Sequence, residues 1–469
     1  MELEPNHFLA SATIALQDIH LQTAMDRGTG NAVRSRATAM GELPHAQALR
    51  QQARGSRLRA LADLPDMLEQ LERNVVANGG HVLWAADARE ANQHVVDICK
   101  AKGLKRGVKS KSMVTEETEL LKALADNDIE MVETDLGEFI IQISGDHPSH
   151  IVMPLMHRTK EAIRDICIDK LDMPYTDDAA EITAFARRYL REKFLDADFG
   201  MSGANFMIAE TGTVVIVTNE GNGRLSTGVP PVHIAMVGIE KVIPTWEDFL
   251  TLVQLIARNG TGQRVTVYVN MFNGAARGEG DGPDEFYLIL VDNGRSNIYG
   301  TQYTEALACI RCGACLNACP VYQNVGGHSY GSVYSGPIGA VLTPLLRGKE
   351  NASPLPFASS LCGACKSACP VDINIPDMLL ALRHDLEGEQ EAVWRLGMKG
   401  YAFGFSHPLL YQAGGRLAGA VTRRFAPKDE QGNIRALPPP LSGWTQEREF
   451  PPFAEQSFHD WWREHRGDK

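Results

Sequence analysis

The sequence predicts an α/β domain with a mostly parallel sheet, followed by a mainly α-helical domain and a helical or irregular C-terminal arm. Three observations support this fold class. Short apolar runs alternate with helical patterns over residues 75–295, which is typical of an α/β domain. Seven of the nine cysteines fall in two short runs over residues 309–369. The stretch after residue 386 is rich in glycine and aromatic residues.

These changes of character predict four parts. We expect an N-terminal helical segment at residues 1–74, the α/β domain at 75–295, the cysteine-bearing domain at 296–385 and a C-terminal interaction region at 386–469. Aromatic side chains such as Phe458, Trp461 and Trp462 lie on the last of these. Aromatics on such a tail predict docking on the parent domain or on a partner subunit.

The first two parts can be divided into expected elements. Apolar residues at helical spacing over 61–75 end at Asn78-Gly79-Gly80, a good helix stop. Thr115 is expected to cap a helix whose first turn carries Glu116 and Glu117. Further helices are expected at 87–102, 159–170, 178–194 and 246–258. Strands are expected at 81–85, 106–110, 129–133, 139–143, 151–153, 205–209, 213–218, 232–237, 264–270 and 286–291.

Composition narrows the class of protein. The net charge is −12 and no run rich in lysine or arginine occurs, which argues against a nucleic-acid-binding protein. No run of about 18 apolar residues is present, so no membrane span is expected. The N-terminus lacks the basic and apolar regions of a signal peptide. Exposed cysteines without a disulfide framework belong in a reducing compartment, so a cytoplasmic location is expected.

Two loops of the α/β domain are candidate ligand sites, because such sheets bind ligands at the carboxyl ends of strands. One contains Lys111, between a strand and a helix N-terminus. The other flanks a strand on both sides and contains Glu210, Glu220 and Arg224, which could orient a carboxylate or transfer a proton. Both loops also read as ordinary turns. Neither the GxGxxG fingerprint of nicotinamide binding nor a P-loop is present.

The cysteine runs carry the most specific signal. The first is a complete C-x2-C-x2-C-x3-C-P run, made of Cys309, Cys312, Cys315 and Cys319. This is the bacterial-type pattern for [4Fe–4S] binding, in which the fourth cysteine ligates the other cluster. Cluster one would therefore take Cys309, Cys312, Cys315 and Cys369, and cluster two would take Cys319, Cys362 and Cys365.

The second run is one cysteine short. Its first position holds Ser359, so cluster two is either [4Fe–4S] with a ligand other than cysteine or [3Fe–4S]. Ser359 or a solvent molecule could supply that ligand, or Ser359 could merely lie beside the cluster. A zinc ribbon is the alternative, but it pairs knuckles with four ligands per metal, and four plus three cysteines do not divide that way.

Beyond these runs, the whole chain resembles the L-lactate utilisation protein B family. The matching segments include Glu133-Thr-Asp-Leu-Gly-Glu138, Val217-Thr-Asn-Glu-Gly-Asn-Gly-Arg224, Cys309-Ile-Arg-Cys-Gly-Ala-Cys315 and Gly336-Pro-Ile-Gly-Ala-Val-Leu-Thr-Pro344. The resemblance implies a LUD domain, similar to isomerase and CoA-transferase folds, fused to a helical ferredoxin. It implies a role with two partner subunits in oxidising L-lactate to pyruvate, and the same cluster ligands.

Three functional hypotheses remain open. The first is an electron-transfer subunit whose two clusters carry the electrons from lactate one at a time. The second places lactate oxidation in the LUD domain, with Glu210 or Glu220 as base and Arg224 or Lys111 holding the carboxylate, although the sequence shows no two-electron acceptor. The third is a cluster-based redox sensor, which the missing nucleic-acid signal disfavours.

Overall fold

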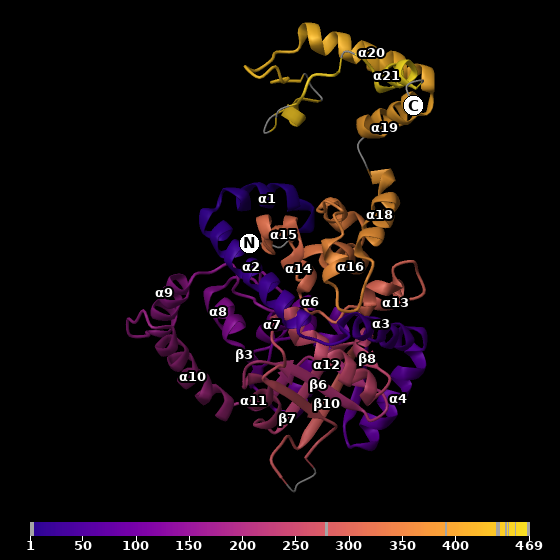
Figure 1. The fold of residues 1–469 in the computed structure, drawn as a ribbon. Coiled ribbons are helices and arrows are strands. Elements are labelled where there is room, and N and C mark those ends of the chain that lie inside the picture. Colours follow the sequence, from indigo (N-terminus) through magenta and orange to yellow (C-terminus); the bar gives the residue numbers. More distant parts are fainter. Residues whose placement is uncertain are drawn as a thin grey trace. The chain divides into compact units, whose positions relative to one another are not determined.

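The computed structural model describes residues 4–276, 280–389, 392–437, 441–445, 448, 450–454 and 456–466. The chain splits into two compact units, Met1–Leu386 and Glu387–Lys469, which are described separately (Figure 1). The first unit contains the expected N-terminal, α/β and cysteine-bearing parts together. Their boundaries at residues 74 and 295 stay predictions.

A six-stranded sheet forms the centre of the α/β part, and all its neighbouring strands are parallel. In spatial order the strands are β1 (His81–Ala85), β10 (Glu285–Val291), β7 (Val232–Gly238), β4 (Phe199–Ser202), β2 (Arg106–Lys109) and β3 (Glu130–Glu133). β4 and β7 are buried along their whole length, as expected for parallel strands covered on both faces. The predicted fold class is confirmed.

Alternating side chains of β7 pack into two separate cores. Ile234 and Met236 join a core with α5 (Ala88–Lys102), α6 (Met113–Glu117) and α7 (Leu120–Ala125). Ala235 and Val237 face the opposite core, where α4 (Leu64–Ala77) contributes leucines and Val75. The two-residue period of a strand accounts for this division.

A second sheet separates this α/β core from the cysteine-bearing part. Its strands, in spatial order, are β8 (Val242–Ile243), β5 (Phe206–Ile208), β6 (Thr213–Thr218) and β9 (Tyr268–Phe272). Met207 and Val214 belong to the α/β core, whereas Phe206, Ile208 and Val215 belong to the core that contains most of the cysteines. This small, mostly antiparallel sheet therefore connects the two parts.

Three local predictions were wrong. Residues 139–143 lie in a helix, α8 (Leu136–Ser144), which Asp135 caps and which packs with α9 (Lys160–Leu171) and α10 (Ala179–Leu195). A short apolar run cannot be distinguished from a buried helix by periodicity alone. Residues 151–153 form no strand. The cap of α6 is Ser112, whose hydroxyl accepts from the amide of Thr115.

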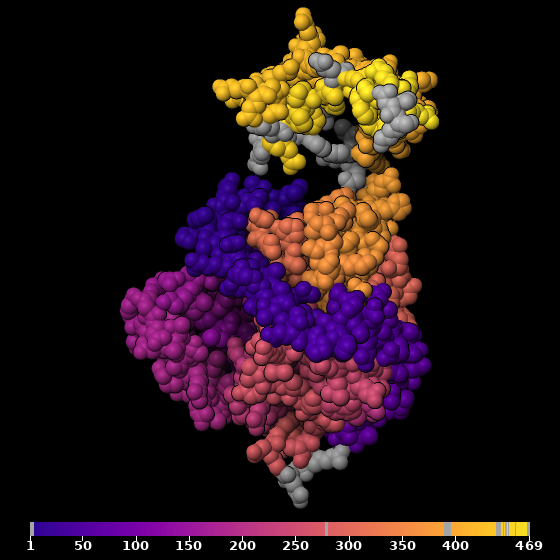
Figure 2. All heavy atoms as spheres, viewed as in Figure 1, coloured from indigo at the N-terminus to yellow at the C-terminus, as the bar shows by residue number. Residues whose placement is uncertain are grey.

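Helices build the remainder of the first unit. The N-terminal segment forms α1 (Phe8–Gln17), α2 (Ile19–Gly41) and α3 (Ala46–Ala62), and it lies across both the α/β and the cysteine-bearing parts (Figure 2). The cysteine-bearing part is helical, as predicted. Its main elements are η3 (Thr304–Ala308), α14 (Ala314–Ala318), α15 (Pro320–Val325), α16 (Gly336–Arg347), α17 (Ala364–Ala368) and α18 (Ile375–Asp385).

The second unit is also helical. It contains α19 (Ala392–Ser406), α20 (Pro408–Phe425) and α21 (Phe458–His465). Arg416 on α20 donates two hydrogen bonds to Asp460 on α21, and Phe458 stacks on Trp461. Trp461 and Trp462 stay exposed, so the predicted docking role of this unit remains a prediction. Among the described residues, no helix is both long and apolar enough to span a bilayer.

Candidate cluster-binding site and adjoining cavity

The two cysteine runs share one backbone conformation. In the first run Arg311 and Gly313 have positive φ values of 59° and 76°, and in the second Leu361 and Gly363 have 55° and 80°. Such left-handed residues make the chain turn sharply, and glycine adopts them at little cost. A five-residue helix follows in each run, α14 and α17. The two runs are therefore structural repeats of each other.

The seven thiols form two groups in space. Burial raises the pKa of Cys315 well above its usual value. The neighbouring thiols of Cys309, Cys312 and Cys369 raise it further. Burial, together with the thiols of Cys319 and Cys362, raises the pKa of Cys365 to about 11. The grouping is the one expected from cysteine spacing. The assignment of ligands to each cluster stays a prediction.

The donors around the sulfur atoms suit iron–sulfur clusters. The amide of Arg311 donates to Cys309 Sγ at 3.4 Å, and that of Ile373 donates to Cys369 Sγ at the same distance. Amide hydrogen bonds to cluster sulfurs tune reduction potentials. Thiols held protonated by burial must also lose their protons when they bind a metal. Four convergent thiols fit one cluster, and three fit a second that needs another ligand.

The two groups differ in exposure. Cys312, Cys315 and Cys369 are each buried, at 7–8% exposure. Cys362 in the second group is exposed. Cys309 in the first group is half-buried, and Cys319 and Cys365 in the second are buried. The second group therefore reaches the surface of the first unit through Cys362.

Arginines from the N-terminal segment contact the second run, and none of them was among the residues predicted from sequence. Arg36 donates to the carbonyl of Ala368 at 2.9 Å, and Arg50 donates to that of Cys369 at 2.7 Å. Arg54 donates to the carbonyl of Asp372. The spacing of Arg50, Arg54 and Arg57 on one helix face was the available signal. These cations lie beside the buried thiols.

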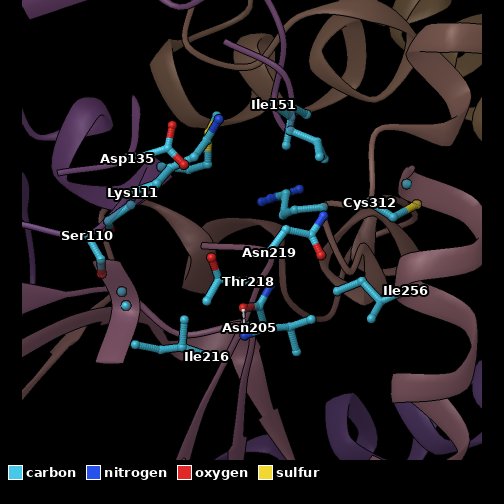
Figure 3. Close-up of a pocket in the computed structure, with 18 of the residues that line it drawn as sticks. Ser110, Lys111, Asp135, Ile151, Asn205, Ile216, Thr218, Asn219, Ile256 and Cys312 are labelled. Atoms are coloured by element: carbon cyan, nitrogen blue, oxygen red, sulfur yellow. Dashed lines mark hydrogen bonds between the residues drawn. The ribbon is translucent and has the colours of Figure 1, made fainter. Parts of the chain in front are cut away.

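A cavity of about 330 Å³ adjoins the first cysteine group (Figure 3). Its wall includes the residues that follow the carboxyl ends of β2, β3, β4 and β7, which is the expected place for a ligand. In Figure 3, Lys111 and Asp135 lie on one side and Ile256 and Cys312 on the other. The sulfur of Cys312 points away from the cavity.

Buried charges occupy the wall beside Cys312. Glu240 pairs with Arg295 at 2.6 Å and with Arg311 at 3.4 Å. Burial alone would raise the pKa of Glu240, but these guanidinium groups outweigh it and lower the pKa to about 2. Arg311 also stacks on Tyr334 at 4.6 Å from the ring centroid. Lys241 is buried and lines the same wall.

Of the four α/β candidates from the sequence, two reach the cavity. Lys111 and Glu220 line it, and Lys111 pairs with Glu138 at 3.2 Å. Burial and the nearby carboxylate of Asp135 raise the pKa of Glu220 to about 7. Glu210 instead accepts from the amide of Trp246 at the start of α12 (Trp246–Gly260), and Arg224 is exposed on α11 (Asn222–Gly228). These two residues lie outside the cavity wall.

A cluster of polar side chains lies elsewhere, around Asp146. His157 Nε2 lies 3.0 Å from Asp146 Oδ2, and Arg158 also binds that carboxylate. The ring of His328 contacts that of His157, and its Nε2 lies 2.7 Å from the carbonyl of His147. These bonds use the ring and carboxylate atoms to fix the loop over residues 146–158.

Three family models match the chain. A LUD domain matches residues 68–291, a 4Fe-4S dicluster domain matches 305–373, and the C-terminal region of lactate utilisation protein B matches 382–467. The predicted LUD domain and pair of [4Fe–4S] clusters are thereby confirmed.

Close relatives span nearly the whole chain. This chain is 46% identical over 453 residues to lactate utilization protein B of Shouchella clausii, and the match covers 96% of this chain and 94% of the relative. It is 46% identical over 439 residues to the protein of that name in Bacillus licheniformis, covering 92% and 91%. The protein of that name in Bacillus thuringiensis is 42% identical over 475 residues, covering 100% of both chains.

Proposed function

This chain belongs to the lactate utilization protein B family, and we propose that it is the iron–sulfur electron-transfer subunit of a complex that oxidises L-lactate to pyruvate. The observation that carries the proposal is the arrangement of the seven thiols. Three of the four thiols in one group are buried beside a cavity of the LUD domain, and the other group reaches the surface through Cys362. Such an arrangement suits a relay between an enclosed site and an external partner.

The proposed ligands follow the two groups. Cluster one is held by Cys309, Cys312, Cys315 and Cys369, and cluster two by Cys319, Cys362 and Cys365. Each would accept and release single electrons. In each run, the cysteine that precedes proline supplies a ligand to the other cluster: Cys319 to cluster two and Cys369 to cluster one. These cysteines directly follow α14 and α17, so each of these helices connects the two clusters.

The protein around these sites has two tasks. Apolar side chains exclude water from the first group, including Ile338 and Leu316 in the same core. Amide donors and the guanidinium groups of Arg36 and Arg50 stabilise negative charge on the sulfur atoms. Both effects adjust the potential at which an electron is accepted.

The partners follow from the exposed group. Cys362 and the exposed ring of Phe357 offer a surface where a partner can approach the second cluster. We propose that two further lactate-utilisation subunits dock on this chain, one of which performs the two-electron step. Because the thiols must stay reduced to bind iron, we place the protein in the cytoplasm.

Iron and sulfide content and EPR spectra of anaerobically purified protein test this function. We expect about eight irons per chain and a signal after dithionite reduction. Cys315→Ser is expected to remove the features of cluster one, and Cys365→Ser those of cluster two. Cys167→Ser, a buried thiol outside both groups, is the control and should keep all the iron. Zinc in place of iron, or equal spectra for the first two variants, would refute the proposal.

A further inference from the structure

The wall of the cavity beside Cys312 has unpaired cationic donors. Arg311 Nη1 is buried and finds no hydrogen-bond partner. Lys241 Nζ forms no ion pair within 4 Å among the residues that the structure describes. Glu240 cannot satisfy both groups, because it also binds Arg295 at 2.6 Å. Burying charged donors without partners is costly, so this wall is suited to an anion.

The excess of positive charge extends behind the wall. Lys241 lies near the buried guanidinium groups of Arg57 and Arg311, and Arg311 lies near that of Arg295. Burial and Arg311 lower the pKa of Lys241 to about 7, so a bound anion would stabilise its charged form. Among the described residues, Glu117 and Glu240 are the carboxylates that pair with these guanidinium groups. The thiolates of cluster one offset part of this charge, yet Arg311 Nη1 and Lys241 Nζ keep unused donors at the cavity.

The rest of the cavity is suited to a short organic chain. Ile151, Ile216 and Ile256 supply apolar surface. Glu220 and Asn222 supply polar groups, and Asn222 Oδ1 is buried without a partner. Apolar surface combined with a few convergent polar groups, in a pocket of this size, is typical of a small-molecule site.

We propose that this cavity binds a small 2-hydroxy or 2-oxo carboxylic acid, with its carboxylate held by Arg311 and Lys241. The hydroxyl or keto oxygen contacts the polar wall that includes Glu220. Binding of a carboxylate is argued from the cavity itself, whereas the choice of acid rests on the proposed function. The acid then lies next to Cys312, a proposed ligand of cluster one.

Calorimetric titration of the anaerobic holoprotein with L-lactate, pyruvate and propionate tests this inference. Lactate or pyruvate is expected to bind, and to alter the line shape of one reduced cluster in EPR, because Arg311 and Cys312 form the wall. Lys241→Met should weaken binding at least tenfold. Lys170→Met on α9, an exposed lysine, is the matched control and should change nothing.

Glu220→Gln is a second variant, because it leaves the buried cations in place. It should weaken lactate binding while iron content stays unchanged. Absence of binding at about 10 mM acid, or equal binding by wild type and Lys241→Met, would overturn the site. Propionate binding as tightly as lactate would overturn the acid class. Iron content and dithionite-reduced spectra of the same samples test the relay separately, so the two proposals can fail independently.

A different observation concerns the missing cysteine of cluster two. Leu361 N donates to Ser359 Oγ at 3.1 Å, as Arg311 N donates to Cys309 Sγ at 3.4 Å in the first run. The donors in both runs are the first left-handed residue of the loop. Ser359 Oγ therefore has the same place in its run as Cys309 Sγ. Arg383 holds the segment by donating to the carbonyl of Ser359 at 2.9 Å.

From this equivalence we infer that Ser359 supplies an oxygen ligand to the fourth iron of cluster two. Ser359→Ala is expected to lower the iron content from about eight to about seven per chain and to give an oxidised [3Fe–4S] signal. Ser359→Cys should keep eight irons with a changed reduced spectrum. Ser367→Ala, an exposed serine of α17, is the control. Unchanged iron content and spectra in Ser359→Ala would overturn the inference.

Discussion

Arg57 is the residue whose replacement should affect the first unit most strongly. Arg57 is 1% exposed, and its guanidinium group donates to four backbone carbonyls. Two of these carbonyls belong to Leu307 and Ala308, which directly precede the first cysteine run. Arg57 nitrogens lie 3.1 and 3.3 Å from their oxygens. The other two carbonyls are those of Glu240, in the turn before β8, and of Val242, the first residue of β8. One side chain of α3 thus connects the LUD domain to the cluster-binding segment.

The structure gives the size of the effect for Arg57→Met. Each carbonyl left buried without a partner costs about 1–3 kcal/mol. Methionine restores the apolar packing of the side-chain stem, and some carbonyls can shift toward water. We therefore expect a loss of about 3–5 kcal/mol, as for removal of one partner from a buried charged pair. For a unit of this size, Met1–Leu386, the loss corresponds to a melting temperature lower by roughly 4–6 °C.

Anaerobic differential scanning calorimetry at a fixed scan rate measures this change, with the visible absorbance of the clusters followed in parallel. Because the bonds reach Leu307 and Ala308, cluster absorbance should be lost at the same lower temperature. Arg73→Met is the matched control, since Arg73 lies on the surface at 67% exposure in a loose pair with Glu69 at 3.7 Å. If Arg57→Met melts within about 1 °C of wild type, the reasoning about buried carbonyls is refuted.

Three other predictions concern charge, protonation and backbone conformation. Arg50→Gln removes a cation beside the buried thiols, so a redox titration should show a lower midpoint potential for one cluster and an unchanged potential for the other. Equal shifts of both potentials would contradict this expectation. Burial and Asp135 raise the pKa of Glu220 to about 7, so the folded chain holds this proton more tightly than the unfolded chain. The protonated carboxyl stabilises the folded chain by at most about 3 kcal/mol, an effect that is complete below pH 4.5 and is lost as the pH rises through 7. Glu220→Gln should therefore raise the melting temperature at pH 8 and leave it unchanged at pH 5. Gly363→Ala forces a side chain into the left-handed region and should cost about 1–2 kcal/mol and lower iron retention, whereas Gly228→Ala, in open space without positive φ, should not.

Local sequence pattern was sufficient for the cofactor and for most elements. The cysteine spacing specifies cluster chemistry because thiolates on one short loop can reach one cluster. Lys111 and Glu220 could be found because they follow strands, where parallel sheets bind ligands. Residues 139–143 were assigned to a strand because a five-residue apolar run has no period long enough to distinguish strand from helix.

The remaining cavity residues could not be predicted from sequence, because tertiary contacts bring them together. Lys241 follows β7, whereas Arg311 lies inside a cysteine run, and only the folded chain brings them to one wall. Glu210 and Arg224 have the same residue types as Glu220 and Arg311, which line the cavity, but Glu210 binds the start of α12 and Arg224 faces solvent. No spacing rule distinguishes these cases, because the difference arises from contacts between residues far apart in the sequence.

The arginines of α2 and α3 also impose an order on folding of the chain. Arg50 binds a carbonyl 319 positions later, and Arg36 one 332 positions later. At about 5–20 residues per second, the ribosome needs roughly 15–60 s to make the intervening segment. During that time α2 and α3 can pack on α12 but lack the partners that the second cysteine run supplies. Their contacts with that run are thus completed late in folding, and a chain truncated before it would lack Cys369 beside the first thiols.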